Sequence, residues 1–280
     1  MPELGQIKLQ KLDSEVLNEF FSKKLTSGRK DRKGGLSPSY VKSIMLIVNA
    51  AIKYAVEEKM CLPLKMPTCT PACTKRIIPI LNHNDQKQLE QYLLMHLDST
   101  KAGILISLHT GLRIGEVCAL SWDDIDFQNH ILRVRHTIAR VKNTDAQYPH
   151  STCLIVDTPK TVASIRDIPI SSVLFPVLMT INSQSSSKYV ISDIKGDRFL
   201  SPRTYEYRYH RLLDEIGIES INYHALRHTF ATRCIEAGVD VKSLSEMLGH
   251  ANVGITLNTY VHSSMELKRL QIEKFTDFLT

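Results

Sequence analysis

Four residues near the C-terminal end carry the side chains needed to cut a phosphodiester bond. His224 and Arg227 are three apart in the string HALRHTFAT, His250 ends LGH, and Tyr260 ends NTY. Residues three apart on a helix share a face, so His224 and Arg227 can point at one target. Arginine binds phosphate oxygens through two N–H groups, histidine moves protons, and tyrosine can form a covalent phosphoester. The set predicts attack on a phosphodiester without a metal ion.

Two strings upstream supply the further cations that such a site needs. Arg113 lies in HTGLRIGE and Lys160 lies in TPKTVASIRDIPI. Gly111 allows a backbone turn that would bring the Arg113 side chain into a cleft. Glu116 could orient Arg113 through its carboxylate, although a simple cap or a surface charge is an equally good interpretation. Taken singly, Arg113 and Lys160 would be exposed surface cations, and only the combination predicts a site.

These five strings, in this order, resemble the tyrosine recombinases of the phage-integrase family. The likeness is greatest to the integrases of conjugative transposons, and it covers roughly residues 35 to 280. The matching strings are HTGLRIGEVCALSWDDID, TPKTVASIRDIPI, HALRHTFAT, LGH and NTY. The resemblance implies an enzyme that cleaves and rejoins DNA strands at specific sites.

The mechanism expected from these parts begins with Tyr260, because no serine or cysteine lies in a nucleophile motif. Its oxygen would attack the phosphorus in line, giving a 3′-phosphotyrosyl link and a free 5′ hydroxyl. His224 is the expected base, and Arg113, Arg227 and His250 would offset the charge that grows on the phosphoryl oxygens. One phosphoester replaces another, so no cofactor or metal is expected.

Two assignments rest on the resemblance itself. The string around Lys160 is similar to the family's lysine hairpin, where a mobile ammonium could protonate the leaving 5′ oxygen. His228 is one step round the helix from Arg227, and its counterpart in relatives is structural. His228 is therefore left out of the predicted site.

Two other functions remain as alternatives. Residues 234–262 have the helix, glycine turn and helix of a helix-turn-helix regulator, which would bind DNA without cutting it. A type IB topoisomerase uses similar residues to nick and swivel DNA. A nicked suicide duplex separates these functions, since a regulator forms no covalent adduct and a topoisomerase relaxes unrelated plasmids.

The positive charge of the chain is concentrated in its first quarter. Residues 1–75 hold 13 Lys and Arg against 7 Asp and Glu, whereas the rest holds 22 of each. One interpretation is a solvent-exposed face with a basic loop that only aids solubility. Because the chain also carries the predicted phosphodiester-cutting site, a phosphate-binding surface is the better interpretation. The candidate DNA-binding residues are Lys24, Arg29, Lys30, Arg32, Lys33 and Lys42.

Composition excludes several other classes of protein. No stretch approaches twenty consecutive apolar residues and no basic-then-apolar leader follows Met1, so neither a membrane span nor a secretory signal is expected. The six cysteines follow no zinc spacing, which favours reduced thiols and no metal site. A bacterial cytoplasmic, DNA-associated protein is expected.

The predicted fold class is mainly α with a small antiparallel β-sheet (α+β). Helical spacing covers residues 13–24 and 37–60, where Tyr40, Ile44, Ile47, Val48, Ala51 and Ala55 form the expected apolar stripe. A proline-containing linker ends near Ile80, a helix starts between Asn82 and Asp85, and another pattern covers 102–119. Residues 130–170 alternate as three strands of one sheet, with Lys160 between the second and third.

These patterns predict two domains, a partial helical core-binding domain at 1–74 and a catalytic domain at 75–280. By the standards of the family the chain begins after the first helix of the DNA-clamping domain. The C-terminal tail has its apolar residues at near-helical spacing, at Met265, Ile272, Phe275, Phe278 and Leu279. In relatives this tail packs on an adjacent protomer, which implies a homotetramer on two DNA sites; packing within the chain is the alternative. Double-stranded DNA is the expected partner, with an excisionase or a host DNA-bending protein as further ones.

Overall fold

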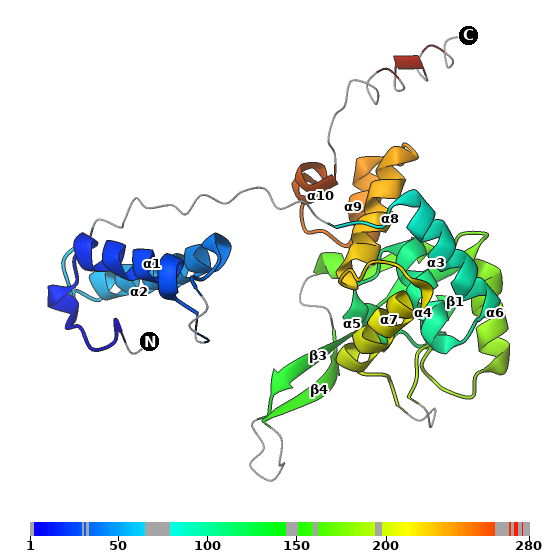
Figure 1. Ribbon diagram of the computed structural model, residues 1–280, viewed down its shortest axis with the longest axis horizontal. Helices are drawn as coiled ribbons and strands as arrows, with labels where there is room; N and C mark the ends of the chain where they lie inside the picture. Colours follow the sequence, from blue (N-terminus) through cyan, green and yellow to red (C-terminus); the bar gives the residue numbers. More distant parts are fainter. Residues whose placement is uncertain are drawn as a thin grey trace. The chain divides into compact units, whose positions relative to one another are not determined.

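The chain divides into two compact units, residues 1–77 and residues 78–280. The structure, a computed structural model (Figure 1), describes residues 3–29, 31, 34–64, 79–143, 151–158, 162–193 and 198–260, together with 269, 272, 273 and 276. Each unit has its own hydrophobic core, and each is described by itself.

Unit 1 is built on two helices whose starts are fixed by polar caps. Helix α1 (Ser14–Ser27) begins at Asp13, whose carboxylate accepts the Val16 N–H at 2.9 Å. Helix α2 (Pro38–Glu57) begins at Ser37 with a proline in its first turn. Both helices are therefore found where the sequence predicts them. Their core joins Leu17, Phe20 and Phe21 of α1 to Val41, Val48 and Ile52 of α2.

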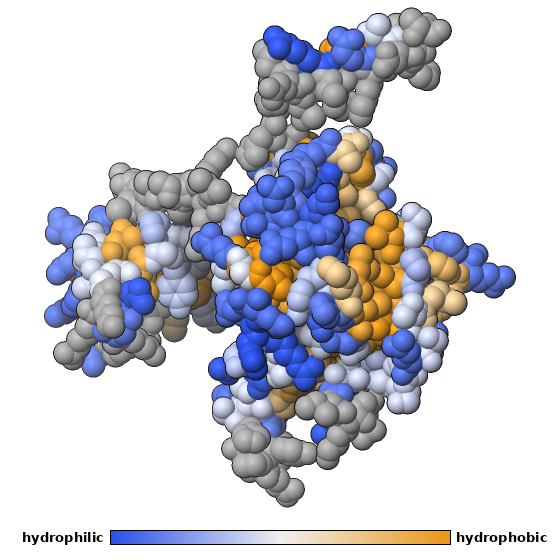
Figure 2. Space-filling view, turned by 45° about the vertical axis from the view of Figure 1, so that its right-hand side comes forward, coloured by the Kyte–Doolittle hydropathy of each residue, from blue (hydrophilic) through white to orange (hydrophobic). Residues whose placement is uncertain are grey.

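The predicted apolar stripe of α2 is partly wrong. The helix buries Val41, Val48, Ile52 and Ala55, whereas Tyr40 and Ile47 are 59% and 63% exposed. Almost every face of α2 carries apolar side chains, and α1 covers only one of them, so the pattern alone could not select the buried stripe. Among the described residues, α2 is also the one helix long and apolar enough to cross a membrane, and one such helix is weak evidence for a span. Apolar residues reach the surface of both units beside hydrophilic ones (Figure 2).

Unit 2 is organised around a central helix. Helix α4 (Ser99–Thr110) contains the apolar run Ile104, Leu105, Ile106 and Leu108, and all four are buried. A helix that is apolar on every side must be surrounded, and α4 packs against α3, α5, α6, α7 and α8. The bounds of these neighbours are α3 His83–Met95, α5 Ile114–Ala119, α6 Leu174–Gln184, α7 Pro202–Ile216 and α8 His224–Glu236. Two short helices, α9 (Val241–Leu248) and α10 (Val253–Tyr260), complete the unit against α8.

The strands of unit 2 form two small sheets, not the single sheet that was predicted. One has the antiparallel order β1-β2-β5, and the other is the antiparallel pair β3-β4. Their bounds are β1 Ile125–Asp126, β2 Ile131–Val134, β3 Thr137–Lys142, β4 Thr152–Asp157 and β5 Arg166–Pro169. The β3-β4 ribbon projects away from the helices (Figure 1).

The single predicted strand is broken at Arg135. The alternating pattern of residues 130–141 predicts one strand, but it is interrupted between β2 and β3. At the break, the Arg135 guanidinium donates to the Arg166 carbonyl at 3.3 Å and pairs with Asp167 at 2.6 Å. These bonds hold the end of β2 against β5, so β3 leaves the first sheet and pairs with β4 alone. The Lys160 position still lies between β4 and β5, two strands that do not pair with each other.

The segment that enters unit 2 is fastened to α8. The Leu81 N–H donates to Thr229 Oγ1 at 3.0 Å, and the Leu81 carbonyl accepts from Arg233 Nη2 at 2.7 Å. Arg233 also donates through Nε to Gln86 of α3 at 2.9 Å. Leu81 is only 2% exposed. The start of the unit is therefore tied to the helix that carries His224 and Arg227.

Candidate active site

Arg113 is delivered by a turn that requires glycine. Helix α4 ends at Gly111, which has φ +67° and ψ +21° in the left-handed region. A Cβ at Gly111 would lie 2.6 Å from Phe230 Cδ1 and 2.8 Å from Leu248 Cδ2. The chain then turns directly into α5, and Arg113 is the N-cap of that helix. This placement of Gly111 and Arg113 is the one predicted from the sequence.

Glu116 is a buried carboxylate that joins two guanidinium groups. It accepts the Arg113 backbone N–H at 2.9 Å and Arg113 Nη1 at 2.8 Å. Its two-pronged contact is with Arg166, whose Nη1 and Nη2 reach the two carboxylate oxygens at 3.2 and 2.9 Å. Burial raises the pKa of Glu116, but the hydrogen bonds and charge of Arg166, with the charge of Arg113, outweigh this and hold the pKa below its ordinary value. Glu116 therefore orients Arg113, and its bonds to Arg166 hold the Glu116 carboxylate in place.

Arg166 was missed by the sequence analysis. It is the first residue of β5 and only 8% exposed. Besides Glu116 it donates to the Met247 carbonyl at 2.6 Å and to the Ser164 carbonyl at 2.9 Å. A signal existed: Arg166 and Ile168 are two apart in β5, so they lie on one face of the strand, and both are buried. A cation on the apolar face of a strand calls for a buried acid.

Arg227 is almost completely buried and spans the ends of two helices. Its exposure is 2%, and its Nη1 and Nη2 donate to the Gly111 carbonyl at 2.9 Å and the Leu248 carbonyl at 2.7 Å. Both acceptors lie at helix C-termini, where carbonyls lack partners within the helix. Burial, followed by the charge of Arg113, lowers the pKa of Arg227. The side chain thus brings the end of α4 and the end of α9 to one point.

His250 follows the glycine that ends α9, as predicted. Gly249 has φ +66°, and Asp240 caps the other end of the helix by accepting the Ser243 N–H at 2.8 Å. A Cβ at Gly249 would lie 3.0 Å from the Ala163 carbonyl and 3.1 Å from Arg166. His250 Nδ1 lies 2.8 Å from Thr256 Oγ1 of α10. The histidine is therefore held between α9 and α10.

Tyr260 ends α10 with its hydroxyl directed at a histidine. It is 9% exposed, and its Oη lies 2.7 Å from Nδ1 of His228, the residue that was left out of the predicted site. The His250 ring is parallel to the Tyr260 ring at a centroid distance of 6.4 Å. Burial raises the pKa of Tyr260, and the charges of Arg227 and Arg113 act to lower it. Tyrosine, histidines and arginines thus meet in one cluster.

The three histidines of this cluster are held neutral by their surroundings. Burial and then the charge of Arg227 lower the pKa of His250 to about 4, with Arg113 and Arg166 adding to the effect. Burial and then His224 and Arg227 lower the pKa of His228 to about 4. The pKa of His224 is lowered for the same reasons, by burial, Arg227 and Arg113. His224 is on the exposed side, and its ring lies 4.6 Å from the His228 ring, edge to face.

Several predicted residues lie elsewhere or outside the described part of the chain. Lys160, Lys30, Arg32 and Lys33 are among the residues that the structure does not describe. In unit 1, Lys24 pairs with Glu3 at 2.7 Å and lies over the Phe20 ring, and Arg29 pairs with Asp31 at 2.9 Å. Lys42 is exposed on α2. Within the described residues no group of three or more His, Cys, Asp or Glu side chains is arranged to hold a metal ion.

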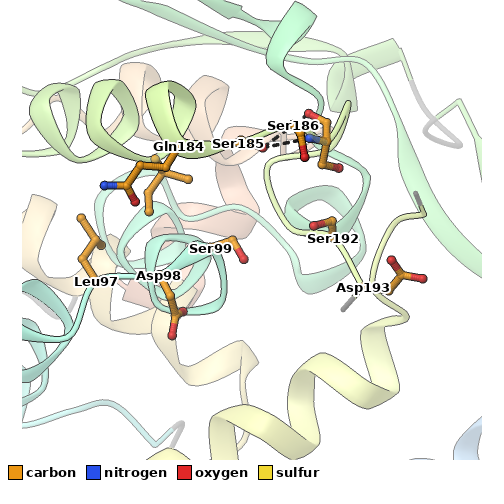
Figure 3. A pocket seen from close by; sticks show the side chains of 10 residues that line it. Leu97, Asp98, Ser99, Gln184, Ser185, Ser186, Ser192 and Asp193 are labelled. Carbon is orange, nitrogen blue, oxygen red and sulfur yellow. Dashed lines mark hydrogen bonds between the residues drawn. The ribbon is translucent and has the colours of Figure 1, made fainter. Parts of the chain in front are cut away.

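A separate pocket of about 330 Å³ lies at the end of α6 and the start of α4 (Figure 3). Its lining includes Asp98, Asp193 and a run of serines at 185–187, and it contains none of the predicted site residues. Two carboxylates and no cation give this pocket the wrong charge for a phosphate. The cluster around Arg227 is therefore the better candidate for phosphodiester chemistry.

Comparison with known proteins places the chain in a family. The phage integrase family matches residues 75–266. A tyrosine recombinase XerC-like protein of Caldanaerobacter subterraneus subsp. tengcongensis is 29% identical over 98% of this chain and 73% of its own length. The transposase from transposon Tn916 of Enterococcus faecalis is 31% identical over 61% of this chain, which spans only 45% of that relative.

Solved structures share the fold. The Tn1549 transposon integrase in complex with transposon right end DNA has a TM-score of 0.79 at 22% identity, covering 98% of this chain and 88% of that one. A lambda integrase dimer bound to a core site has a TM-score of 0.64 at 16% identity, covering 94% and 85%.

Fold and site together define a DNA strand transferase that uses a tyrosine. The chain belongs to the phage integrase family, and it is a tyrosine site-specific recombinase. The two alternatives, a helix-turn-helix regulator and a type IB topoisomerase, are not favoured.

Proposed function

We propose that Tyr260 is the nucleophile of this recombinase and that Arg113, Arg227 and His250 bind the phosphate that it attacks. The observation that carries the proposal is the position of the Tyr260 hydroxyl, which lies 2.7 Å from His228 Nδ1, beside the His250 ring and near enough to Arg227 and Arg113 for their charges to act on its pKa. A phenol near two fixed positive charges is poised to attack an anionic phosphodiester, because the cations offset both the phosphate charge and the forming phenolate.

The proposed reaction is an exchange of phosphoesters. The Tyr260 oxygen attacks the scissile phosphorus, the bond to the 5′ oxygen breaks, and a 3′-phosphotyrosyl link remains. Arg113 is 37% exposed at its side chain and can meet the incoming phosphate, whereas Arg227 is already held by two carbonyls. The 5′ hydroxyl of a partner strand reverses the step, so one bond is made for each bond broken. His224 is proposed as the base that takes the Tyr260 proton, and the His250 ring lies beside the phenol at a centroid distance of 6.4 Å.

Lys160 is proposed as the acid that protonates the leaving 5′ oxygen. Its support is the sequence, which puts a lysine between β4 and β5, and the family resemblance of the surrounding string. Lys160→Ala should slow cleavage by a factor on the order of 100. A substrate with sulfur at the 5′ bridging position needs no protonation and should restore the rate. Equal rescue of Arg113→Ala by the same substrate would show that Lys160 is not specifically the acid.

A nicked suicide duplex tests the nucleophile. The duplex is made from the DNA that flanks the gene, and the covalent adduct is resolved on a denaturing gel. Wild type should form the adduct, whereas Tyr260→Phe should form none yet bind DNA almost as well, since only one oxygen is lost. Tyr207→Phe, at an exposed tyrosine of α7, is the matched control and should cleave normally. A persistent adduct in Tyr260→Phe would move the nucleophile elsewhere.

Unit 1 is proposed to hold DNA through the basic residues around its α1–α2 connection. Solved relatives include integrases in complex with DNA. Neutralising Lys30, Arg32 and Lys33 together should weaken binding at many sequences alike and lower the log–log salt slope by about 0.9 for each lost phosphate contact. Lys53→Ala on α2, whose side chain is 78% exposed, is the control. An unchanged slope in the triple variant would mean that these residues lie in a solvated loop and do not contact phosphate.

We also propose how the protein assembles and where in the cell it acts. A homotetramer on two DNA sites, with the tail after Tyr260 packed on a neighbouring protomer, accounts for the apolar spacing of residues 265–279. Deleting residues 267–280 should keep single-site binding and abolish pairing of two sites on a native gel. If the truncated chain still pairs two sites, the tail packs within its own chain. The proposed location is the bacterial cytoplasm, with an excisionase or a host DNA-bending protein setting direction.

A further inference from the structure

Arg166 is a buried cation to which the proposed reaction gives no role. Its side chain is 5% exposed. Through Nε it donates to the Met247 carbonyl in the last turn of α9 at 2.6 Å, and through Nη1 to the Ser164 carbonyl at 2.9 Å. Through Nη1 and Nη2 it reaches both oxygens of Glu116, at 3.2 and 2.9 Å. The protein itself therefore fixes this guanidinium in one orientation.

The Glu116 carboxylate is saturated by this arrangement. Oε1 accepts from Arg166 Nη1 and Arg113 Nη1, and Oε2 accepts from Arg166 Nη2 and the Arg113 backbone N–H. An ionised carboxylate offers about four lone-pair sites, and these bonds occupy them. Glu116 thus has room for one side-chain bond from Arg113. Among the described residues, the other side-chain nitrogens of Arg113 have no acceptor.

The unused donors of Arg113 are the ones that an incoming phosphate needs. The Arg113 side chain is 37% exposed, and a guanidinium binds a phosphate best through two parallel N–H bonds. The same fork also fits a carboxylate. A Glu116 carboxylate with free sites on both oxygens would therefore compete with the phosphate for the fork of Arg113. The side chain that occupies those sites is Arg166.

We propose that Arg166 is a positioning residue: it occupies both oxygens of Glu116 and so keeps the Arg113 guanidinium open to the scissile phosphate. Arg166 touches no reacting atom in this scheme and acts only through Glu116 and Arg113. Burial raises the pKa of Glu116, and the bonds and charge of Arg166 lower it more than the charge of Arg113 does, as expected of the main ion-pair partner. The inference rests on the proposed role of Arg113 in phosphate binding.

Three variants separate occupation of Glu116 from support of the fold. Arg166→Lys keeps the buried charge but has no fork, so it cannot hold both carboxylate oxygens. Arg166→Gln also removes the charge. Arg135→Gln is the matched control, because Arg135 braces the same strand through the Arg166 carbonyl and Asp167, and none of its hydrogen bonds in the described part of the chain reaches Glu116. Single-turnover cleavage of the suicide duplex is measured at saturating DNA, at a temperature where each variant is folded.

The substrate supplies a readout that a purely structural role would not move. One duplex carries the ordinary scissile phosphate, and a second carries a methylphosphonate there, which has no negative charge. On the phosphate, Arg166→Lys and Arg113→Ala should both cleave on the order of 100-fold more slowly than wild type, the cost of a displaced clamp. On the methylphosphonate both deficits should shrink to a few-fold, because a neutral centre needs no cation. Arg135→Gln should match wild type on each substrate.

A double variant tests the competition directly. In Arg166→Gln the open Glu116 carboxylate draws the fork of Arg113 inward. Adding Glu116→Gln replaces that carboxylate with a neutral amide, which binds a guanidinium more weakly. The double variant should therefore cleave the phosphate several-fold faster than Arg166→Gln alone. A double variant that is no faster overturns the inference.

The outcomes separate this inference from the proposed function. If methylphosphonate rescues Arg113→Ala but not Arg166→Lys, Arg166 only supports the fold and the inference is wrong, while the phosphate contact of Arg113 stands. If Arg166→Lys cleaves the phosphate as fast as wild type, a buried charge is enough and occupation of both oxygens is not the reason for Arg166. If methylphosphonate does not rescue Arg113→Ala, the proposed phosphate contact of Arg113 is wrong, and the inference falls with it.

Discussion

The arginine half and the imidazole half of the site are held in opposite ways. Each guanidinium is fixed by several bonds: Arg227 by two helix-end carbonyls, and Arg166 by two carbonyls and the Glu116 carboxylate. Within the part of the chain that the structure describes, the imidazoles of His228 and His250 each make one hydrogen bond, to a hydroxyl of α10. Positive charge can be placed before substrate arrives, because a guanidinium does not change state during the reaction. Proton transfer needs groups that can change partner.

The largest expected effect of breaking the arginine half is at Arg227. Arg227→Ala should lower the cleavage rate by roughly 100- to 1,000-fold, the range seen when one fixed donor to a transition state is removed. It should also lower the free energy of unfolding, since two buried carbonyls lose their donors at about 1–3 kcal/mol each. Urea unfolding and single-turnover cleavage measure the two effects.

Arg113→Ala is the matched variant, because its side chain is 37% exposed and, among the described residues, donates to the Glu116 carboxylate and not to a carbonyl. It should lose a similar rate with little loss of stability. Equal losses of stability in the two variants would contradict the view that Arg227 stabilises the fold and Arg113 does not.

Glu116→Gln removes the charge between two guanidinium groups and keeps the shape of the side chain. Removing one partner of a buried ion pair costs on the order of 3 kcal/mol, and urea unfolding of the variant should show a loss near that size. The pKa of Glu116 is lowered by folding, so this contribution is present above the unfolded pKa and is lost as the pH falls through the folded one. The gap between wild type and Glu116→Gln should therefore close in acid. A gap that is constant with pH would mean that the charge of Glu116 does not stabilise the fold.

Gly111→Ala tests whether the turn before Arg113 tolerates a side chain. A left-handed φ costs a non-glycine residue about 1 kcal/mol, and the new Cβ would also clash with Phe230 and Leu248, adding about 1–3 kcal/mol. Gly217→Ala is the control, since Gly217 has φ +74° at the end of α7 with no atom within 4 Å of the new Cβ. Thermal unfolding should show a larger loss for Gly111→Ala, and cleavage should fall only there. Equal losses of stability would mean that the clash with Phe230 and Leu248 does not destabilise the Gly111→Ala variant.

The imidazole half is expected to give a dependence of stability on pH. The pKa values of His228 and His250 are lowered to about 4, so the unfolded chain binds more protons between pH 6.5 and 4. Stability should therefore fall as the pH falls through that window. Thermal melts of wild type against the double variant His228→Asn, His250→Asn should show a weaker pH dependence in the variant. If the pH dependence of stability is the same in the double variant, it comes from other histidines.

Helix starts and the main site strings could be predicted because their causes are local. Asp13, Ser37 and Asp240 each cap a helix with their own side chain, and Gly111 and Gly249 end helices in a conformation that favours glycine. Such features depend on three or four neighbouring residues. A sequence therefore contains nearly all the information needed to place them.

Arg166 and His228 could not be assigned because their partners are far away in the chain. Arg166 is 50 residues from Glu116 and 81 from Met247, and His228 is 32 from Tyr260. Which ring nitrogen meets the nucleophile depends on how α8 and α10 pack. The same is true of the sheets, where the bonds of Arg135 to β5 override a pattern that alternates without a break.

The two hydrogen bonds that fasten Leu81 to α8 give the recombinase a mechanical link. Any pull on the chain that precedes Leu81 is transmitted to Thr229 and Arg233, on the same rod of backbone as Arg227 and His228. A helix is stiff along its axis, so a small displacement at this anchor moves Arg227 and His228 together.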